Sequence, residues 1–301
     1  MKIAIIGSTS FLGQFLIKEF VDAQYLLTLF GSIESKDYSE LPFKYFRYPN
    51  TSLDYNLLSE FDVIIYTAGA GIQSNLQESS EIIYELNSFI PIRIQNALFQ
   101  SNFKGKFITF GSYFEIGNEL TDKSFSEEEL VASSNLVPNH YCASKRILSR
   151  YLNSCHQTID FYHLILPNIY GKGENESRII PYLLNAIQND TDIKLTSGLQ
   201  YRQYIHATDI AKAVLDIANG NYSKGLYNLC NDSSVQIKDL VKSVFLVTGN
   251  EHRYIEEKLF GTAVRTDTAM PYLKMNNAKA KQTFSFQPQI SINEGIKSYL
   301  E

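Results

Sequence analysis

The sequence predicts an α/β protein built on a doubly wound parallel sheet, with a smaller α/β part toward the C-terminal end. Three observations favour this class. Short segments that are apolar on both faces alternate with helical segments up to residue 166. A glycine-containing turn joins the first strand to the first helix, and beyond Pro167 the loops lengthen while the strands shorten. Strands buried on both faces are typical of a parallel sheet that helices cover on both sides.

The alternation can be followed element by element from the N-terminus. Runs of β-branched and aromatic residues predict strands at 3–6, 25–30, 43–48, 63–66, 106–110 and 161–166. Apolar residues at helical spacing predict helices at 11–21, 53–58, 82–100, 141–154, 180–188 and 235–247. The acidic run 127–129 is expected to be a solvated helix face or a loop.

The composition of the 301 residues is that of an ordinary globular protein, with 44% hydrophobic and 20% charged residues. A net charge of −5 argues against nucleic acid or an anionic membrane as the main partner, because both attract a basic protein surface. The three cysteines lack paired spacing, which fits a reducing compartment. No apolar run approaches the roughly 18 residues of a membrane span, so we expect a cytoplasmic protein.

The turn after the first strand reads Gly-Ser-Thr-Ser-Phe-Leu-Gly. Free N–H groups at the start of a helix, together with the positive end of its dipole, attract a pyrophosphate. Gly7 would permit the tight turn and Gly13 the close contact of helix and sheet, while Ser10 stands where a middle glycine is usual. A plain strand-to-helix turn is the alternative. The candidate cofactor-binding residues of this turn are Gly7, Ser8, Thr9, Ser10, Phe11, Leu12 and Gly13.

Tyr141 and Lys145 stand four residues apart on a predicted helix, which places the phenol and the ammonium on one face, about one turn apart. A nearby cation is expected to lower the pKa of a tyrosine from about 10, so that the phenol can exchange a proton with a substrate near neutral pH. The spacing alone is weak evidence, because Tyr254 and Lys258 repeat it. We interpret that second pair as surface residues.

Ser112 follows the predicted strand 106–110, at the edge of the sheet where ligands bind in open α/β folds. Its hydroxyl could hold a carbonyl oxygen that Tyr141 protonates. A simple turn residue is the alternative for Ser112 considered by itself. The tyrosine, the lysine and the glycine turn together favour the catalytic interpretation.

These motifs occur in one order along the chain: the glycine turn, Ser112, the pair Tyr141 and Lys145, then Pro-Asn-Ile-Tyr-Gly at 167–171 and Arg-Gln-Tyr-Ile-His-Ala-Thr-Asp at 202–209. Together they resemble the extended short-chain dehydrogenase/reductases that act on nucleotide sugars. The resemblance covers essentially the whole chain. It implies a Rossmann-type dinucleotide-binding fold, a nucleotide-diphosphate sugar as substrate and a nicotinamide cofactor, NADP(H) or NAD(H).

The resemblance also implies roles for individual residues. Ser112 would hydrogen-bond the reacting oxygen, Tyr141 would be the acid/base, and Lys145 would orient the cofactor ribose and keep the phenol acidic. Further expected cofactor-binding positions are Ala68, Gly69, Asn87 and Pro167. The positions expected to bind the substrate are Ser112, Tyr113, Asn168, Arg178, Arg202 and Arg265.

Three of these substrate positions, Asn168, Arg202 and Arg265, would hold the nucleotide and its diphosphate. A guanidinium suits a diphosphate because it makes paired, charge-assisted hydrogen bonds. For Arg202 a surface ion pair is the alternative without the family resemblance. An apolar wall against the sugar or the base is expected from Tyr113, Phe114 and Tyr201.

Departures from the family patterns narrow the reaction. The sugar 4,6-dehydratases carry an Asp-Glu pair immediately after the position of Ser112, where this sequence has Tyr113 and Phe114, so dehydration is not expected. The fucose-forming epimerase/reductases use a cysteine and a histidine where Phe114 and Arg178 stand here. The strand 25–30 ends without an acidic residue for a ribose 2′-hydroxyl, which weakens an NAD-only interpretation.

The reaction that remains compatible with these departures is hydride transfer without elimination of water. The stretches 173–175, 179–182 and 196–202 are similar to reductases of 4-keto-6-deoxyhexose nucleotides, a group that includes the CDP-abequose synthases. The expected activity is NAD(P)H-dependent reduction of the 4-keto group of such a sugar in bacterial surface-polysaccharide biosynthesis. Two alternatives stay open: a nucleotide-sugar 4-epimerase with tightly bound NAD⁺, and a dinucleotide sensor without catalytic activity.

The expected organisation follows from the same resemblance. Residues 1–166 would form the cofactor-binding domain, to which part of 202–230 returns, and residues 167–301 would mainly bind the nucleotide sugar. A homodimer is expected through the helices 82–100 and 141–154. No nucleic acid, membrane or metal ion is expected as a partner.

Overall fold

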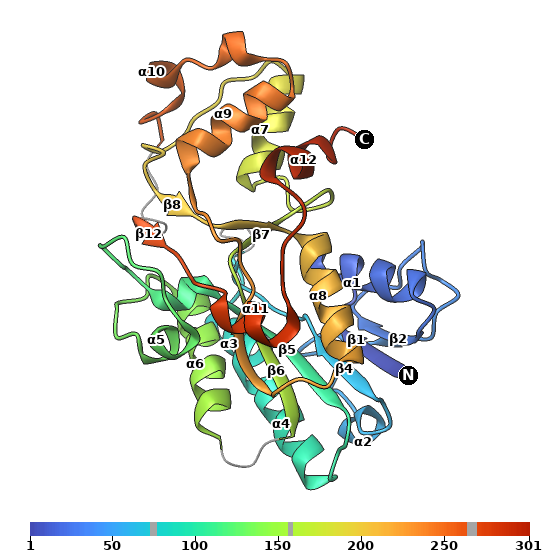
Figure 1. Cartoon of the computed structure of the whole chain (residues 1–301). Coiled ribbons are helices and arrows are strands. Elements are labelled where there is room, and N and C mark those ends of the chain that lie inside the picture. Colours follow the sequence, from blue (N-terminus) through green and yellow to red (C-terminus); the bar gives the residue numbers. More distant parts are fainter. Residues whose placement is uncertain (73–76, 156–158, 264–269) are drawn as a thin grey trace.

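The computed structural model describes residues 1–72, 77–155, 159–263 and 270–301 (Figure 1). Its centre is a seven-stranded sheet with the order β10-β6-β5-β4-β1-β2-β3, in which each neighbouring pair is parallel. The strands are β1 Lys2–Ile6, β2 Leu26–Gly31, β3 Phe43–Tyr45, β4 Val63–Tyr66, β5 Lys106–Ser112, β6 Asp160–Leu166 and β10 Gly225–Asn228. From the central β1/β4 pair, the strands continue to β2 and β3 on one side and to β5, β6 and β10 on the other. The doubly wound parallel sheet predicted from the sequence is thus confirmed.

Helices cover both faces of this sheet, because alternate residues of each strand point to opposite sides. Ile3 and Ile5 of β1 belong to one buried core, and Ala4 and Ile6 to the other. The first core includes residues of α1 Phe11–Asp22, α8 Ala207–Asn219 and α11 Ala278–Phe284. The second side carries α2 Tyr55–Leu58, α3 Ser80–Tyr84, α4 Ile90–Gln100, α5 Glu127–Ala132 and α6 His140–Ser154.

A third core lies outside the main sheet, in the upper part of Figure 1. It contains buried residues such as Tyr170, Leu183 and Val244. Its strands form a two-stranded sheet, β7-β9, and a three-stranded sheet, β11-β8-β12. The elements of this part are β7 Asn168–Tyr170, α7 Ile179–Gln188, β8 Tyr201–Arg202, β9 Tyr204–His206, β11 Val235–Gln236, α9 Ile237–Val247, η4 Glu251–Arg253, α10 Glu256–Leu259, β12 Tyr272–Leu273 and α12 Ile292–Lys297.

Between β9 and β11 the chain returns to the main sheet. Helix α8 packs against α1, and β10 pairs with β6 in parallel register, with Tyr227 opposite Leu164. The loops that follow β5 and β6 therefore face the third core across the carboxyl edge of the sheet, which is where open α/β sheets bind their ligands.

The segment 82–100, predicted as one helix, consists of three successive pieces. Helix α3 is followed by a π-helical turn, η2 Glu85–Phe89, and then by α4. Pro91 near the start of α4 has no N–H for the carbonyl of Asn87, so the regular hydrogen-bond pattern cannot run through this point. The wider π turn takes up the change and turns Asn87 into the protein interior, where its side chain is 1% exposed.

The acidic run 127–129 forms the first turn of α5. Glu128 and Glu129 are exposed, as expected for a solvated face. For Glu127 that expectation is wrong: the side chain is buried, and its carboxylate accepts the N–H of Asn228 at 2.7 Å. Burial raises the pKa of this carboxyl group above its ordinary value.

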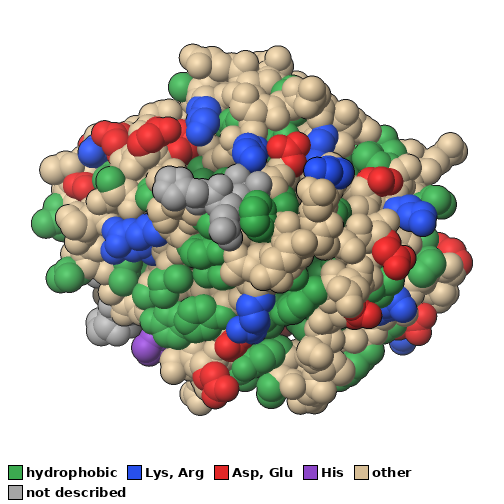
Figure 2. Space-filling view, turned by 90° about the horizontal axis from the view of Figure 1, so that it is seen from below, with side chains coloured by type: hydrophobic (Ala, Val, Ile, Leu, Met, Phe, Trp, Pro, Cys, Tyr) green, Lys and Arg blue, Asp and Glu red, His purple; other side chains and the backbone are tan. Residues whose placement is uncertain are grey.

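The surface mixes acidic and basic side chains around groups of hydrophobic ones, as Figure 2 shows for one face. Within the described ranges, no helix is long and apolar enough to cross a bilayer. The same residues contain no group of three or more His, Cys, Asp and Glu side chains placed to hold a metal ion.

Candidate active site

The glycine turn lies where β1, β4 and the start of α1 come closest together. Gly7 has a φ of +90°, and a Cβ at this position would lie 2.4 Å from the backbone nitrogen of Ala68. A Cβ on Gly13 would lie 2.6 Å from the carbonyl oxygen of Gly7. Ser10 caps α1 by accepting the N–H of Gly13 at 3.0 Å, and its hydroxyl also contacts Thr67. The two glycines therefore allow the backbone segments around the helix start to pack closely together.

The residues of this turn divide into two groups. Thr9, Ser10, Phe11 and Leu12 line a cavity of about 360 Å³ at the carboxyl edge of the sheet. Gly7, Ser8 and Gly13 do not line it. The N–H groups of Gly7 and Ser8 both donate to the carbonyl of Phe30, at 2.8 and 3.0 Å. The N–H groups of these two residues are thus already used by β2. The first-turn N–H groups of α1, at Phe11 and Leu12, remain the donors placed for a phosphate.

Asn87 ties the loop after β4 to helix α6. Its side-chain oxygen accepts the N–H of Ala70 at 3.0 Å, and its nitrogen donates to the carbonyl of Ala70 at 2.8 Å and to the hydroxyl of Ser144 at 3.0 Å. Gly69 leaves room for this amide, since a Cβ there would lie 2.9 Å from the Asn87 oxygen. Gly69, Asn87 and Pro167 line the 360 Å³ cavity, whereas Ala68 lies behind it and donates its N–H to Ile6.

Ser112, Tyr141 and Lys145 line the same cavity, from the end of β5 and the first half of α6. The side chains of Ser112 and Tyr141 both face this cavity, and Ser112 acts to lower the pKa of the phenol. Ser112 also caps the short helix η3 Tyr113–Ile116. The ammonium of Lys145 donates to the carbonyl of Phe110 at 2.9 Å and lies 6.0 Å from the centre of the Tyr141 ring. The fold therefore brings Ser112 to the same cavity as Tyr141 and Lys145, although Ser112 and Lys145 are more than 30 positions apart in the sequence.

The ionisation of the pair differs from the expectation based on spacing. Burial raises the pKa of Tyr141 well above its ordinary value, although Ser112 acts in the opposite direction. Burial also lowers the pKa of Lys145 to about 8. The prediction that Lys145 keeps the phenol acidic is therefore wrong for the protein by itself, because desolvation outweighs a cation held against Phe110. The phenol stays protonated, and hence able to donate a proton, throughout the neutral range.

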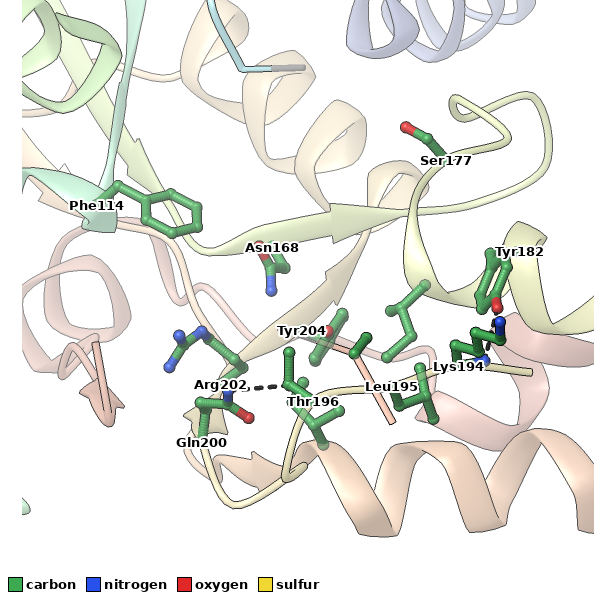
Figure 3. Close-up of a pocket in the computed structure, with 13 residues that line it drawn as sticks. Phe114, Asn168, Ser177, Tyr182, Lys194, Leu195, Thr196, Gln200, Arg202 and Tyr204 are labelled. Atoms are coloured by element: carbon green, nitrogen blue, oxygen red, sulfur yellow. Dashed lines mark hydrogen bonds between the residues drawn. The ribbon is translucent and has the colours of Figure 1, made fainter. Parts of the chain in front are cut away.

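A second cavity of about 430 Å³ adjoins the first and shares Phe114 and Asn168 with it. In Figure 3, Phe114, Asn168 and Arg202 lie toward one end of this cavity, and Tyr182 and Lys194 toward the other. Arg202 is 5% exposed and donates to the carbonyls of Tyr201 and Met270, both at 2.8 Å. It is therefore held by backbone carbonyls at the cavity wall, which does not fit the alternative of a surface ion pair.

Arg178 lies on the wall of the first cavity and is fixed by residues that the sequence analysis did not select. Its Nε lies 2.6 Å from a carboxylate oxygen of Glu174, and its guanidinium donates to the carbonyl of Ile169 at 3.0 Å. Tyr299, close to the end of the chain, donates its hydroxyl to Glu174 and accepts the N–H of Gly171 at 2.8 Å. The i,i+4 spacing of Glu174 and Arg178 was a possible signal in the sequence. The sequence holds no comparable signal for the contribution of Tyr299.

Three predicted positions stand apart from the cavities or cannot be placed. Tyr113 is fully buried in the second core and lines neither cavity, because η3 turns its ring inward, so the prediction that it contacts the substrate is wrong. Tyr201 stacks on Tyr272 with ring centres 5.4 Å apart and lines neither cavity. Phe114 alone of the expected apolar wall lines both. Arg265 lies outside the described residues.

A nicotinamide dinucleotide fits the residues of the first cavity. The free start of α1, which Gly7 and Gly13 allow to pack closely against the neighbouring backbone, suits a pyrophosphate. Tyr141 and Lys145 stand farther along the same wall. The duplicate pair Tyr254 and Lys258 lines neither cavity, and the Tyr254 hydroxyl donates to Glu256 at 3.3 Å.

A dinucleotide cradle with serine, tyrosine and lysine at the carboxyl edge of a parallel sheet defines the class of short-chain dehydrogenase/reductases. More particularly, the chain belongs to the NAD dependent epimerase/dehydratase family, which it matches over residues 3–230. Membership of this family confirms the predicted extended short-chain dehydrogenase/reductase and its nicotinamide dinucleotide cofactor.

Individual relatives are distant. The chain is 28% identical over 164 residues to CDP-abequose synthase of Salmonella muenchen, an alignment that covers 53% of this chain and 55% of the relative. It thus spans about half the length of this curated relative and of the Salmonella typhimurium CDP-abequose synthase. UDP-N-acetyl-alpha-D-glucosaminuronate decarboxylase of Bacillus cytotoxicus is 23% identical, with 99% of this chain and 96% of the relative covered.

Solved structures with the same fold align over the whole chain. UDP-glucose 4-epimerase of Thermotoga maritima, solved with UDP-glucose, matches with a TM-score of 0.82 at 16% identity and covers 100% of this chain and 98% of its own. A dTDP-glucose 4,6-dehydratase of Streptomyces venezuelae, solved with NAD, matches with a TM-score of 0.81 at 15% identity, over 100% and 97% of the two chains. At this level of identity the likeness establishes the Rossmann-type fold.

Proposed function

We propose that this protein is an NAD(P)H-dependent reductase of the 4-keto group of a nucleotide-linked 4-keto-6-deoxyhexose. One observation carries the proposal. The side chains of Ser112 and Tyr141 line the same cavity, while the two positions that follow Ser112 hold aromatic rings instead of carboxylates. This arrangement can bind and protonate a carbonyl oxygen, and it lacks the paired acid and base that eliminate water.

The other acids near the site support the same conclusion. Among the described residues that line the 360 Å³ cavity, the carboxylates are those of Glu78 and Glu174. Glu78 accepts the N–H of Gly71, and Glu174 is paired with Arg178 and hydrogen-bonded by Tyr299. Both are engaged by other groups, so neither is placed as an independent base at a sugar carbon.

In the proposed reaction the chain supplies orientation and a proton. Ser112 holds the carbonyl, and Tyr141, which burial keeps protonated, donates its proton to the developing alkoxide. Lys145 and Asn87 would hold the cofactor side of the cavity, and Phe114 would limit water access. The bound nicotinamide cofactor supplies the hydride. Asn168, Arg178 and Arg202 would orient the nucleotide diphosphate.

The names of some relatives support a choice of substrate. Those from Salmonella are CDP-abequose synthases, which favours a cytidine diphosphate sugar over other nucleotide sugars. We further propose that residues 1–166 with part of 202–230 bind the cofactor, that residues 167–301 mainly bind the nucleotide sugar, and that the enzyme serves surface-polysaccharide biosynthesis in the cytoplasm. A homodimer through η2, α4 and α6 would cover Phe89, Phe99 and Ile147, which are 41%, 40% and 38% exposed. Sedimentation analysis tests the dimer.

The substrate is tested by incubating the purified protein with CDP- and dTDP-linked 4-keto-6-deoxyglucose and either NADPH or NADH. We expect stoichiometric oxidation of one reduced cofactor and a reduced sugar nucleotide as product, identified by mass spectrometry and NMR. Comparing the two cofactors also decides between NADP(H) and NAD(H). Protein that carries bound NAD⁺, consumes no reduced cofactor and interconverts an unmodified UDP-hexose would instead be a 4-epimerase.

Replacing Tyr299 by phenylalanine should weaken substrate binding through Arg178. The change removes the hydroxyl that donates to the buried Glu174 carboxylate and accepts from Gly171. A hydrogen bond to a charged group is worth about 1.5–3 kcal/mol, so we expect KM for the nucleotide sugar to rise by about tenfold or more, with a smaller change in kcat. Tyr222→Phe is the matched control, because its hydroxyl donates to Asp216 at 2.9 Å on the exposed surface. Equal KM values for Y299F and the wild type would contradict the role.

A further inference from the structure

The residue that follows Lys145 joins helix α6 to the turn after β5. Arg146 lies half-buried on α6, and within the described part of the chain its guanidinium donates four hydrogen bonds. Two go to the carbonyl of Glu115, from Nε at 2.8 Å and from Nη2 at 2.5 Å. Nη2 also donates to the carbonyl of Ile116 at 3.1 Å, and Nη1 to that of Asn135 at 2.9 Å. The guanidinium therefore binds backbone oxygens of two separate segments at once.

The backbone beside this guanidinium is shaped to admit it. Gly117 has a φ of +81°, and a Cβ at this position would lie 2.9 Å from Nη2 of Arg146. The same Cβ would lie 2.7 Å from the carbonyl oxygen of Leu136 and 2.9 Å from that of Asn135. A planar fork of N–H donors suits a cluster of carbonyls that a single ammonium could not bind together. Gly117 thus leaves the space in which the fork lies.

The carbonyls that Arg146 holds belong to the end of η3, and the start of η3 carries Ser112. The Ser112 hydroxyl accepts the N–H of Phe114 at 3.4 Å, and the Ser112 N–H donates to the carboxylate of Glu115 at 2.8 Å. Phe114, within η3, lines both cavities. Arg146 is therefore connected by hydrogen bonds to the turn that presents two residues to the site.

Helix α6 has a second attachment, to the sheet, that does not involve the arginine. The Ser149 hydroxyl of α6 contacts Nε2 of His163 in β6 at 2.8 Å, and Nδ1 of this histidine contacts the Thr109 hydroxyl of β5, also at 2.8 Å. All three side chains are buried. Loss of the guanidinium should therefore loosen the turn while the helix stays packed on the sheet.

We propose that Arg146 is a positioning residue of the active site: by holding the end of η3 against α6, it fixes Ser112 relative to Tyr141. These two side chains line one cavity but come from different elements. Both can reach one carbonyl oxygen only if turn and helix keep a fixed separation, and a misplacement of about 1 Å can cost about a hundredfold in rate. This catalytic consequence rests on the proposed function, whereas the link between turn and helix does not.

The link is tested in cofactor-free protein by amide hydrogen exchange, followed by mass spectrometry. Arg146→Met removes the four hydrogen bonds and keeps an unbranched side chain. We expect exchange across residues 112–117 to accelerate by about tenfold or more, because charge-assisted hydrogen bonds are the strong ones and their loss favours local opening. Arg146→Lys keeps the charge without the fork, so it should resemble R146M rather than the wild type.

Arg150→Met is the matched control. Arg150 lies one turn farther along α6 and also donates to backbone carbonyls, those of Val131 at 3.0 Å and Ser133 at 2.6 Å. These acceptors lie outside η3, so exchange across residues 112–117 in R150M should equal that of the wild type.

The kinetic readout separates positioning from a general loss of structure. We expect kcat of R146M to fall by roughly ten- to hundredfold, with KM for the cofactor within about twofold of the wild type. The cofactor side should be spared because Asn87 is held by Ala70 and Ser144. R150M should keep nearly full kcat. The reaction followed is reduction or epimerisation, whichever the wild type catalyses.

Unchanged exchange across residues 112–117 in folded R146M overturns the proposal, and so does an equal acceleration in R150M. Faster exchange with an unaltered kcat would make the arginine a structural contact only, and full kcat in R146K would show that the fork is not required. The exchange measurement uses neither cofactor nor sugar. A wild type that acts on none of the nucleotide sugars therefore refutes the proposed reaction, while the exchange result still decides whether Arg146 holds the turn.

Discussion

Tyr141→Phe should lower kcat by about a thousandfold at saturating substrate and cofactor. The change removes the hydroxyl that would donate the proton in the cavity lined by Ser112 and Tyr141, and general acid catalysis contributes roughly 10²–10⁴-fold to a rate. The ring itself remains, so its edge-to-face contact with Phe114, with ring centres 6.4 Å apart, is kept. Steady-state kinetics with the proposed 4-keto-6-deoxyhexose nucleotide measures the loss.

The same helix offers a matched control for this change. The hydroxyl of Tyr151 donates to Asn96 at 2.7 Å on the exposed side of α6, outside both cavities. Tyr151→Phe should retain nearly full activity. Binding of reduced cofactor, followed by fluorescence, and the thermal midpoint should be close to the wild type in both variants. Residual activity of Y141F above about a tenth of the wild-type value would show that another group donates the proton.

Gly7→Ala should both destabilise the fold and abolish cofactor binding. A residue other than glycine pays about 1–2 kcal/mol at a positive φ, and the φ of Gly7 is +90°. The added Cβ would also lie 2.4 Å from the backbone nitrogen of Ala68, where no flexible side chain can give way. Overpacking of this kind costs about 1–3 kcal/mol, so we expect the free energy of unfolding to fall by about 2–5 kcal/mol.

Gly173→Ala separates the two causes. Gly173 has a φ of +92°, and nothing lies within 4 Å of the position that its Cβ would take. It should show the backbone cost without the clash, and hence a smaller loss of stability in a urea titration. Reduced cofactor at concentrations that saturate the wild type should fail to bind G7A and should still bind G173A. Equal losses of stability in the two variants would refute the close approach of β1 and β4 as the cause.

Much of the main sheet is determined by local patterns. The strand 63–66 was predicted with the bounds that it has in the structure, and the helix predicted at 11–21 ends one residue later. Such segments are apolar on both faces or at strict helical spacing, so few alternative arrangements would bury them. The segments after residue 200 were harder to predict, because two- and three-residue strands such as β8 and β9 carry no periodic signal.

The candidate site was recoverable only where a motif is local. The glycine turn and the spacing of Tyr141 and Lys145 are each visible within seven residues of sequence. The inward turn of Tyr113 was not visible, because nothing in the sequence says which side of η3 faces the core. The proton affinity of Tyr141 was wrongly predicted from its neighbour along the helix, since burial, a property of the whole fold, has the larger effect.

By itself the sequence determined the alternation of strands and helices up to residue 166, the position of the glycine turn and the candidate serine, tyrosine and lysine. These features depend on residues close together in the chain, whose patterning and chemistry are local. Only the tertiary structure decided that the Glu115 carboxylate is buried against the N–H of Ser112 and that Tyr299 holds Glu174 against Arg178. Both arrangements depend on burial and on contacts between distant segments, and desolvation and charge pairing arise only once those segments have packed together.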